Sequence, residues 1–326
     1  MILSLIICTH NPNLERLHHA VKSVTEQNPK DYHVELLIVD NASDISLASN
    51  QFSYLGFEIK YLIEPNLGLT NARICGIINS IGDYLVFVDD DNVLDRFYLK
   101  NTIDIIEQYP GLGCFGAGVI NPIYEIEPAA ELLPFLNSLA VRKESSFIIS
   151  DDYFDFAYPY GAGMIVKRDV ALEYVADVRS SDLKLSLDRK GKILNSCGDD
   201  HFSWIAIRMG YKKGVFPQLV LKHYIPANRV QKEYLLKLAE GYGFSRSLLF
   251  YINGVPFPGL DSIKSNEINK TDVSTIRLKL YLIKRSIKKL LTIQRFSIHE
   301  EFENAHNNGV LRFYRDVYLK QVKIKD

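Results

Sequence analysis

Largely apolar runs alternate with segments of helical periodicity over the first hundred residues. A buried run is typical of a strand that is covered on both faces, whereas apolar side chains at helical spacing indicate a helix that packs one face. This alternation predicts a mostly parallel sheet with right-handed crossovers. The expected strands are residues 3–8, 34–39, 57–63 and 84–88, and the expected helices are residues 14–27 and 69–81.

The alternation loosens from about residue 101. Residues 121–158 carry prolines, aromatics and mixed charge, which is typical of an irregular region that faces a substrate. Further along the chain we expect strands at 111–118, 161–166 and 220–223, a helix at 199–209 that Gly210 stops, and a long helix at 230–251.

The C-terminal part of the chain differs in composition. Residues 277–295 contain several basic residues, no acidic one and regularly spaced apolar ones, which predicts a basic amphipathic helix. Such a helix either lies on an anionic membrane surface or packs on the rest of the chain or on another subunit. We therefore divide the chain into residues 1–100, residues 101–255 and a basic helical extension at 256–326.

The overall composition limits the classes of function. A net charge of −1 gives no reason to expect a nucleic-acid partner. The four cysteines are far apart and form no C-x-x-C pair, so we expect reduced thiols rather than disulfides or a zinc site. No stretch has the length of a membrane span, and the first residues lack a basic leader. We expect a cytoplasmic protein, either free or peripheral at the inner face of the cell membrane.

Three adjacent aspartates, Asp89, Asp90 and Asp91, follow the apolar strand at 84–88. Ligands of open parallel sheets bind beyond the carboxyl ends of the strands. Three carboxylates there repel one another unless water or a cation offsets their charge, and their hard oxygens suit Mg²⁺ or Mn²⁺. Because strand side chains alternate, we expect Asp89 and Asp91 to face one way and Asp90 the other. The alternative is an acidic surface turn.

Four segments, in this order and spacing, resemble the successive motifs of glycosyltransferase family 2. They are Ile6-Ile7-Cys8-Thr9-His10-Asn11, Val39-Asp40-Asn41-Ala42-Ser43-Asp44, Asn66-Leu67-Gly68-Leu69-Thr70-Asn71-Ala72-Arg73 and Phe87-Val88-Asp89-Asp90-Asp91. The resemblance continues more loosely to about residue 250. It implies an α/β protein of the GT-A fold, a Rossmann-like, mostly parallel sheet flanked by helices, here with a helical C-terminal extension.

The resemblance also implies an inverting enzyme. Such an enzyme moves a sugar from a nucleotide-diphosphate sugar, most often a UDP-sugar, to a glycan or a lipid-linked glycan, here in bacterial surface polysaccharide synthesis. The divalent cation would be held by Asp89 and Asp91, with His223 as an extra ligand. The family usually has Tyr where this chain has His10, which leaves the base of the nucleotide open. The implied contacts to the nucleotide-sugar are Thr9, Asn11, Asp40, Asn71, Arg73, Asp89 and Asp90.

A second pair of carboxylates, Asp199 and Asp200, opens the expected helix at 199–209. Inverting transfer needs a base that takes the proton of the acceptor hydroxyl, and a carboxylate suits this task. The family commonly has Glu-Asp here with the aspartate as base, so we assign Asp200 as base and Asp199 as its neighbour. The alternative is that the pair only caps the helix.

Other features have two interpretations each. His223 is a metal or phosphate ligand or a structural histidine, Arg229 pairs with the diphosphate or lies on the surface, and Trp204 stacks on an acceptor sugar or belongs to the core. A nucleotidyltransferase or a dinucleotide oxidoreductase would show a glycine-rich phosphate loop after the first strand, and Thr9–Asn13 has none. A non-catalytic nucleotide-sugar-binding protein stays open, and so does the oligomeric state.

Overall fold

The computed structural model describes residues 1–27, 33–48, 51–52, 57–155, 157–255, 297–318 and 320. Ten strands form one mixed sheet in the order β3-β2-β1-β4-β9-β6-β10-β5, with β7 on β6 and β8 on β10. The elements are β1 (Ile2–Thr9), α1 (Leu14–Thr25), β2 (His33–Asn41), β3 (Ile59–Glu64), α2 (Leu69–Asn79), β4 (Tyr84–Asp89), β5 (Asn92–Leu94), α3 (Tyr98–Gln108), β6 (Leu112–Tyr124), η2 (Ala130–Leu139), β7 (Arg142–Lys143), β8 (Ile148–Ser150), β9 (Met164–Lys167), α4 (Arg168–Arg179), α5 (Asp182–Leu185), α6 (Gly198–Arg208), β10 (Lys212–Ile225), η3 (Ala227–Val230), α7 (Lys232–Ile252), α10 (Ile298–Phe313) and η4 (Tyr314–Tyr318).

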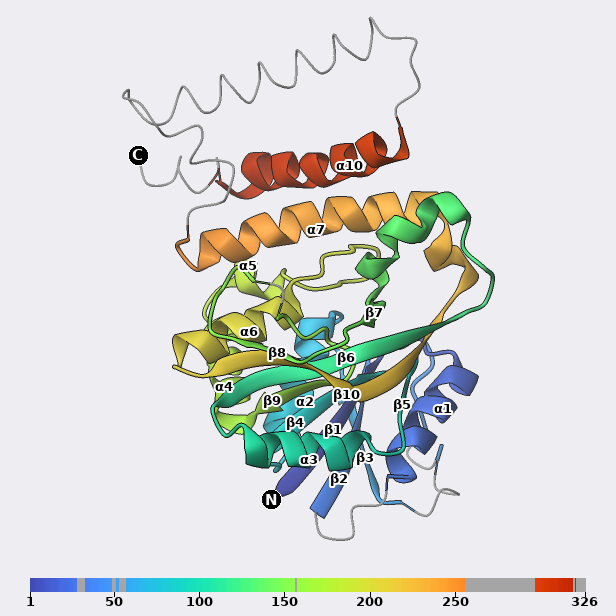
Figure 1. Cartoon of the computed structure of the whole chain (residues 1–326), viewed down its shortest axis with the longest axis vertical. Coiled ribbons are helices and arrows are strands. Elements are labelled where there is room, and N and C mark those ends of the chain that lie inside the picture. The colour runs from blue at the N-terminus through green and yellow to red at the C-terminus, as the bar shows by residue number, and fades with distance from the viewer. Residues whose placement is uncertain are drawn as a thin grey trace, which may run out of the picture.

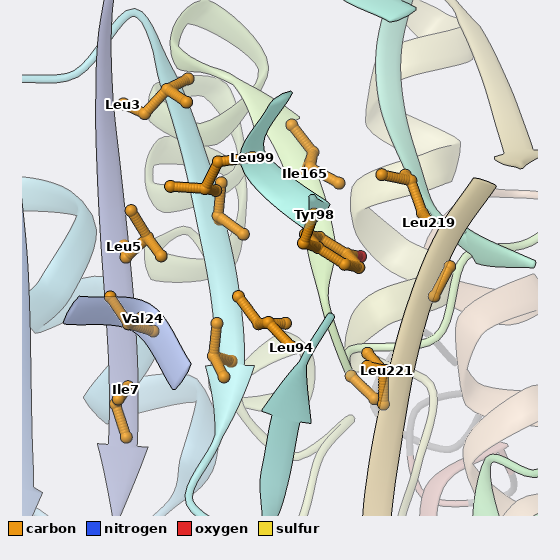
Figure 2. Close-up of a cluster of buried hydrophobic side chains, with 14 of the residues drawn as sticks. Leu3, Leu5, Ile7, Val24, Leu94, Tyr98, Leu99, Ile165, Leu219 and Leu221 are labelled. Atoms are coloured by element: carbon orange, nitrogen blue, oxygen red, sulfur yellow. The ribbon is translucent and has the colours of Figure 1, made fainter. Parts of the chain in front are cut away.

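Helices cover both faces of the sheet. Alternate β1 residues Leu3, Leu5 and Ile7 lie in one apolar cluster with side chains of α1 and α3, which Figure 2 shows with Val24 and Leu99. Ile6, between them in the sequence, belongs to a second cluster with α2, α4 and α6. Burial on both faces explains why this strand is apolar at nearly every position.

The parallel part of the sheet brings polar residues of different strands to one edge. β1 pairs in parallel with β2 and with β4, and β2 pairs in parallel with β3. In this register Thr9 lies opposite Asp40, and Cys8 lies opposite Asp89. The carboxyl ends of β1, β2 and β4 therefore meet at one edge, as the sequence predicts.

The other part of the sheet is mixed. β9 runs antiparallel to both β4 and β6, and β10 runs parallel to β6 but antiparallel to β5 and β8. The prediction of a short strand at 220–223 is wrong in length, because those residues are the end of β10. The loosening expected from residue 101 is also wrong, since α3 (98–108) and α4 (168–179) continue the alternation and bury their apolar faces on opposite sides of the sheet.

Two long helices, α7 and α10, run side by side at one end of the molecule, and η2 packs against α7 (Figure 1). Phe302 of α10 joins the apolar cluster of η2, η3 and α7, and its ring stacks on Phe135 with centroids 3.7 Å apart. The predicted basic helix at 277–295 lies outside the described residues. Within the described part of the chain, no helix has both the length and the apolar content to cross a bilayer.

The predicted fold class is confirmed. The structure has the GT-A arrangement of a sheet flanked by helices on both faces, followed by a helical C-terminal region. Its longest ladders, β1–β2 and β6–β10, are parallel. The four cysteines carry no disulfide, as expected.

Candidate active site

A cavity of about 1310 Å³ opens at the carboxyl edge of β1 and β4. One set of lining residues belongs to the ends of these strands and the start of α2, and we call this the donor side, after the nucleotide-sugar contacts predicted there from the sequence. A second set belongs to α6, β7, α7 and α10, and we call this the acceptor side, after the base predicted on α6. Both predicted carboxylate groups lie in this one cavity, although about 110 residues separate them in the sequence: they are Asp89, Asp90 and Asp91 on the donor side and Asp199 and Asp200 on the acceptor side.

The three donor-side aspartates have different partners. Asp90 accepts a hydrogen bond from the hydroxyl of Thr9 at the end of β1. Asp91 is only 7% exposed; its Oδ2 accepts a hydrogen bond from Arg229 at 3.0 Å, and its Oδ1 lies 3.5 Å from Nε2 of His223. The expected alternation of the three side chains is wrong, because β4 ends at Asp89 and the next two residues form a turn. The acidic surface turn is also excluded, since all three line the cavity.

Crowding separates the acidities of these carboxyl groups. Burial and the charge of Asp91 raise the pKa of Asp89, and the same two causes raise the pKa of Asp90 to about 7. Burial acts in the same direction on Asp91, but His223, Arg229 and Arg189 outweigh it and lower its pKa to about 2. Asp91 is therefore the permanent anion of the three, and a further positive charge would favour ionisation of the other two.

The donor set of this edge fits a divalent cation. Asp89 and Asp91 offer hard oxygens, and the buried Nδ1 of His223 has no hydrogen-bond partner among the described residues. In the part of the chain that the structure describes, no three His, Cys, Asp or Glu side chains converge on one point. The predicted set of Asp89, Asp91 and His223 is thus not assembled as three ligands in advance. Mg²⁺ is usually held by one or two carboxylates together with substrate phosphates, so the set fits a cation that arrives with a diphosphate.

Arg73 lines the cavity, and its charge is already paired with a carboxylate of the protein. The side chain is buried, and its Nη1 donates to Oδ2 of Asp188 at 2.6 Å, in an ion pair whose two members are 5% and 6% exposed. A Cβ at Gly161 would lie 2.5 Å from Nη2 of Arg73, so only glycine allows this approach. The ion pair therefore connects α2 to the segment before α6, and Arg73 is among the residues that line the cavity.

Three other predicted nucleotide contacts do not line the cavity. Both carboxylate oxygens of Asp40 accept backbone amides, those of Ser43 and Leu47. The side chain of Asn11 exchanges hydrogen bonds with Asp44. The side-chain amide of Asn71 donates to the carbonyls of residues 66 and 67. These side chains brace the loops around the cavity, whereas Thr9, Arg73, Asp89 and Asp90 line it.

Asp199 and Asp200 open α6 but have different surroundings. Asp199 accepts the amide of Gly161 at 2.9 Å and the amide of Asp200 at 3.1 Å, so its two oxygens are engaged by backbone. No backbone amide of the described residues is bonded to the carboxylate of Asp200. Burial and the charge of Asp199 raise the pKa of Asp200 to about 7. The helix-capping alternative is wrong for Asp199, because the N-cap of α6 is Cys197 and no described side chain caps the helix; both aspartates lie in its first turn and line the cavity.

Several cavity residues have no sequence motif that singles them out. Arg189 lines the donor side and contributes to the low pKa of Asp91. It belongs to the charged run Asp188-Arg189-Lys190, which lies over the first turn of α2, where the carbonyl of Arg189 accepts the amide of Leu69. The sequence feature that could have pointed to Arg189 is a charged run next to Gly191. Trp204 is 3% exposed and donates to the hydroxyl of Tyr158, which makes it a core residue.

Comparisons with known proteins agree with this geometry. Residues 4–152 match the family model of glycosyl transferase family 2. An uncharacterized glycosyltransferase of Haemophilus influenzae is 30% identical over 112 residues, which are 34% of this chain and 36% of that protein. Glycosyltransferase GlyA of Streptococcus pneumoniae is 28% identical over 95 residues, 28% of this chain and 13% of that protein.

Two further similarities come from other kinds of protein. An inactive polypeptide N-acetylgalactosaminyltransferase-like protein 5 of Macaca fascicularis is 27% identical over 128 residues, 38% of this chain and 28% of that protein. The crystal structure of residues 1–349 of S. aureus TarS has a TM-score of 0.43 and 14% identity, covering 82% of this chain and 76% of that one. The chain spans about a third or less of the length of the three curated relatives named here.

Proposed function

We propose that this chain, whose residues 4–152 match the family model of glycosyl transferase family 2, is an inverting, metal-dependent glycosyltransferase. Its donor is a nucleotide-diphosphate sugar, and its acceptor is the hydroxyl of a glycan or lipid-linked glycan. One observation supports this most directly: one cavity is lined both by an anionic edge suited to a metal and a diphosphate and by a half-buried carboxyl of raised pKa, that of Asp200.

The proposed reaction is one displacement at the anomeric carbon. Asp200 takes the proton of the acceptor hydroxyl while that oxygen forms its bond to the anomeric carbon, and the bond to the diphosphate breaks on the opposite face. The nucleoside diphosphate leaves with the bonding electron pair, so the anomeric configuration inverts. A bound divalent cation supplies Lewis-acid stabilisation of the leaving diphosphate. Arg189 and Arg229 line the same donor side and add positive charge there.

The pathway and the donor base are part of the proposal. The proposed pathway is assembly of a bacterial surface polysaccharide from a UDP-sugar, as the sequence motifs imply, and two bacterial relatives are named as glycosyltransferases. His10 lies at the mouth of the cavity, and its Nδ1 is 2.8 Å from the carbonyl oxygen of Asn41. This contact fixes the ring where the family usually has Tyr.

The competing function is a nucleotide-sugar-binding protein without catalysis. One relative is named as inactive, so the fold alone does not imply turnover. The position of Asp200 favours the enzyme, since a binding protein has no need of a half-buried, partly protonated carboxyl that faces the acceptor side.

The test is thermal unfolding of the full chain with UDP, GDP and UDP-sugars, each with and without Mn²⁺, followed by an assay of slow donor hydrolysis. A ligand that binds only the folded state raises the melting temperature. We expect the largest rise with a nucleoside diphosphate and Mn²⁺ together, and release of free sugar from the matching donor. Binding without any hydrolysis or transfer would favour the non-catalytic function, and no nucleotide binding either with or without Mn²⁺ would refute both.

A further inference from the structure

The acceptor side of the cavity carries two arginines, Arg246 and Arg142, whose hydrogen bonds go to neutral oxygens and not to carboxylates. Arg246 of α7 donates from Nη1 to the hydroxyl of Tyr242 at 2.7 Å, and its guanidinium lies 5.4 Å from the ring centroid of Phe250. Among the described residues, no carboxylate oxygen lies within 4.0 Å of its nitrogens. A cation that is partly withdrawn from water is costly unless an anion accompanies it.

Arg142 of β7 is similar. Its side chain is 10% exposed, its guanidinium stacks 3.9 Å from the ring centroid of Tyr160, and its Nη1 donates to the carbonyl of Tyr158 at 2.7 Å. The nearest carboxylate is that of Glu144, 3.7 Å from Nε, which is longer than a hydrogen bond. Stacking on an aromatic ring holds a guanidinium in a fixed plane and leaves its edge for an anion.

Both arginines belong to the surroundings of the proposed base. The charge of Arg246 acts on the carboxyl of Asp200 and on the hydroxyl of Tyr158, whose carbonyl accepts the bond from Arg142. Burial raises the pKa of Tyr160, as do the charges of Asp199 and Asp200, whereas the charge of Arg142 acts against this rise. The two guanidinium groups and the proposed base therefore line the same cavity.

On the donor side, two arginines are neutralised by carboxylates of the protein itself. Arg73 is paired with Asp188 at 2.6 Å, and Arg229 is paired with Asp91 at 3.0 Å. These carboxylates belong to the protein and leave the arginines little need of another anion. On the acceptor side aromatic rings and neutral oxygens contact the two guanidinium groups, and the carboxylate of Glu144 stays 3.7 Å from Nε of Arg142.

The last wall of this acceptor side comes from α10. His306 lines the cavity, and its ring lies 6.2 Å from that of Tyr242, measured between centroids. α10 is held on α7 by ion pairs from Lys232 to Glu301 at 2.6 Å and from Arg312 to Glu240 at 2.8 Å. α10 therefore contributes to the lining of the cavity.

We propose that the acceptor carries an anionic group, a phosphate or a carboxylate, which binds between Arg246 and Arg142 beside Asp200. This inference rests on the proposed function and names the chemical class of its acceptor. The guanidinium fork matches the oxygens of a phosphate or carboxylate with two parallel hydrogen bonds. A neutral glycan offers no charge to these arginines.

The test uses the full chain saturated with UDP and Mn²⁺, so that the donor side is filled. Methyl phosphate, methyl glucuronide and neutral methyl glucoside are then titrated by calorimetry. We expect at least one anionic probe to bind and the glucoside not to bind. In Arg246→Gln we expect the Kd of that probe to rise about ten- to hundredfold, with the Kd of UDP unchanged. The phosphate and the glucuronide arms identify which anion the acceptor carries.

Arg208→Gln is the matched control, because Arg208 is an exposed arginine on α6 that does not line the cavity. It should bind all probes as the unaltered chain does. If Arg246→Gln does not fold, Arg246→Lys keeps the charge but loses the fork, and it should still weaken the anionic probe. Equal binding of charged and neutral probes, or full anion binding in the Arg246 variants, would overturn the proposal. Absence of UDP binding refutes the proposed function instead, and the same probes without UDP then test the anion site alone.

Discussion

The two sides of the cavity contain carboxylates whose pKa values are shifted in opposite directions. On the donor side Asp91 is surrounded by His223, Arg229 and Arg189, so its pKa falls to about 2 although it is buried. On the acceptor side Asp200 lies next to Asp199 in a buried setting, and its pKa rises to about 7. Equal side chains thus acquire different chemistry from their neighbours. A permanently charged carboxylate suits a cation, and one that titrates near neutral pH suits proton transfer.

The largest effect is expected from Asp200→Asn. The amide cannot accept a proton, so donor hydrolysis should fall by about 10²- to 10⁴-fold. The Kd of UDP with Mn²⁺ should not change, because the substitution lies on the acceptor side. Asp104→Asn, on the exposed face of α3, is the control and should be fully active. An equal loss of nucleotide binding and hydrolysis would contradict the assignment of Asp200 as base.

Asp91→Asn probes the other side of the comparison. It removes the most acidic of the three carboxyl groups and leaves Arg229 without its anion. We expect Mn²⁺-dependent binding of UDP to weaken on the order of 10- to 100-fold, measured by titration calorimetry. The same gain from Mn²⁺ in the variant and in the unaltered chain would show that Asp91 does not hold the cation.

The pH dependence should report Asp200. Burial and Asp199 raise its pKa to about 7, and the base must be ionised to accept a proton. The rate of donor hydrolysis should therefore decrease about tenfold for each pH unit below roughly 7 and level off above it. Nucleotide binding must be followed over the same pH range, because the pKa of Asp90 on the donor side is also about 7. A rate that does not vary with pH under saturating donor would exclude this role for Asp200.

The smallest effect is expected from a substitution in α10, which lines only the acceptor side of the cavity. A Cβ at Gly309 of α10 would lie 1.9 Å from the carbonyl oxygen of Glu240 on α7, so Gly309→Ala must separate the two helices. We expect a loss of about 1–3 kcal/mol in the free energy of unfolding, with UDP binding retained. Gly111→Ala, where an added Cβ meets nothing within 4 Å, is the control. Equal melting temperatures of the two variants would mean that the α7–α10 contact is not tight.

Much of this architecture follows from local pattern. The buried run before Asp89 predicts a strand that ends at the aspartates, and the apolar spacing after Asp199 predicts a helix that begins at the carboxylate pair. Both are found, because periodicity and strand ends depend on residues close in sequence. α3 and α4 were not predicted, although their apolar residues recur at helical spacing. Glycines, prolines and mixed charges nearby made that spacing harder to recognise.

What the sequence determined by itself is the sheet-and-helix order and the two sets of carboxylates. Only the tertiary structure decided which charges surround them. β10 pairs with β5 and thereby carries His223 to Asp91, while Asp188 reaches Arg73 across more than a hundred residues. α7 and α10 bring Arg246 and His306 to the acceptor side. The physical reason is that the pKa of a buried carboxyl and the need of an arginine for an anion depend on neighbours in space, which no spacing along the chain specifies.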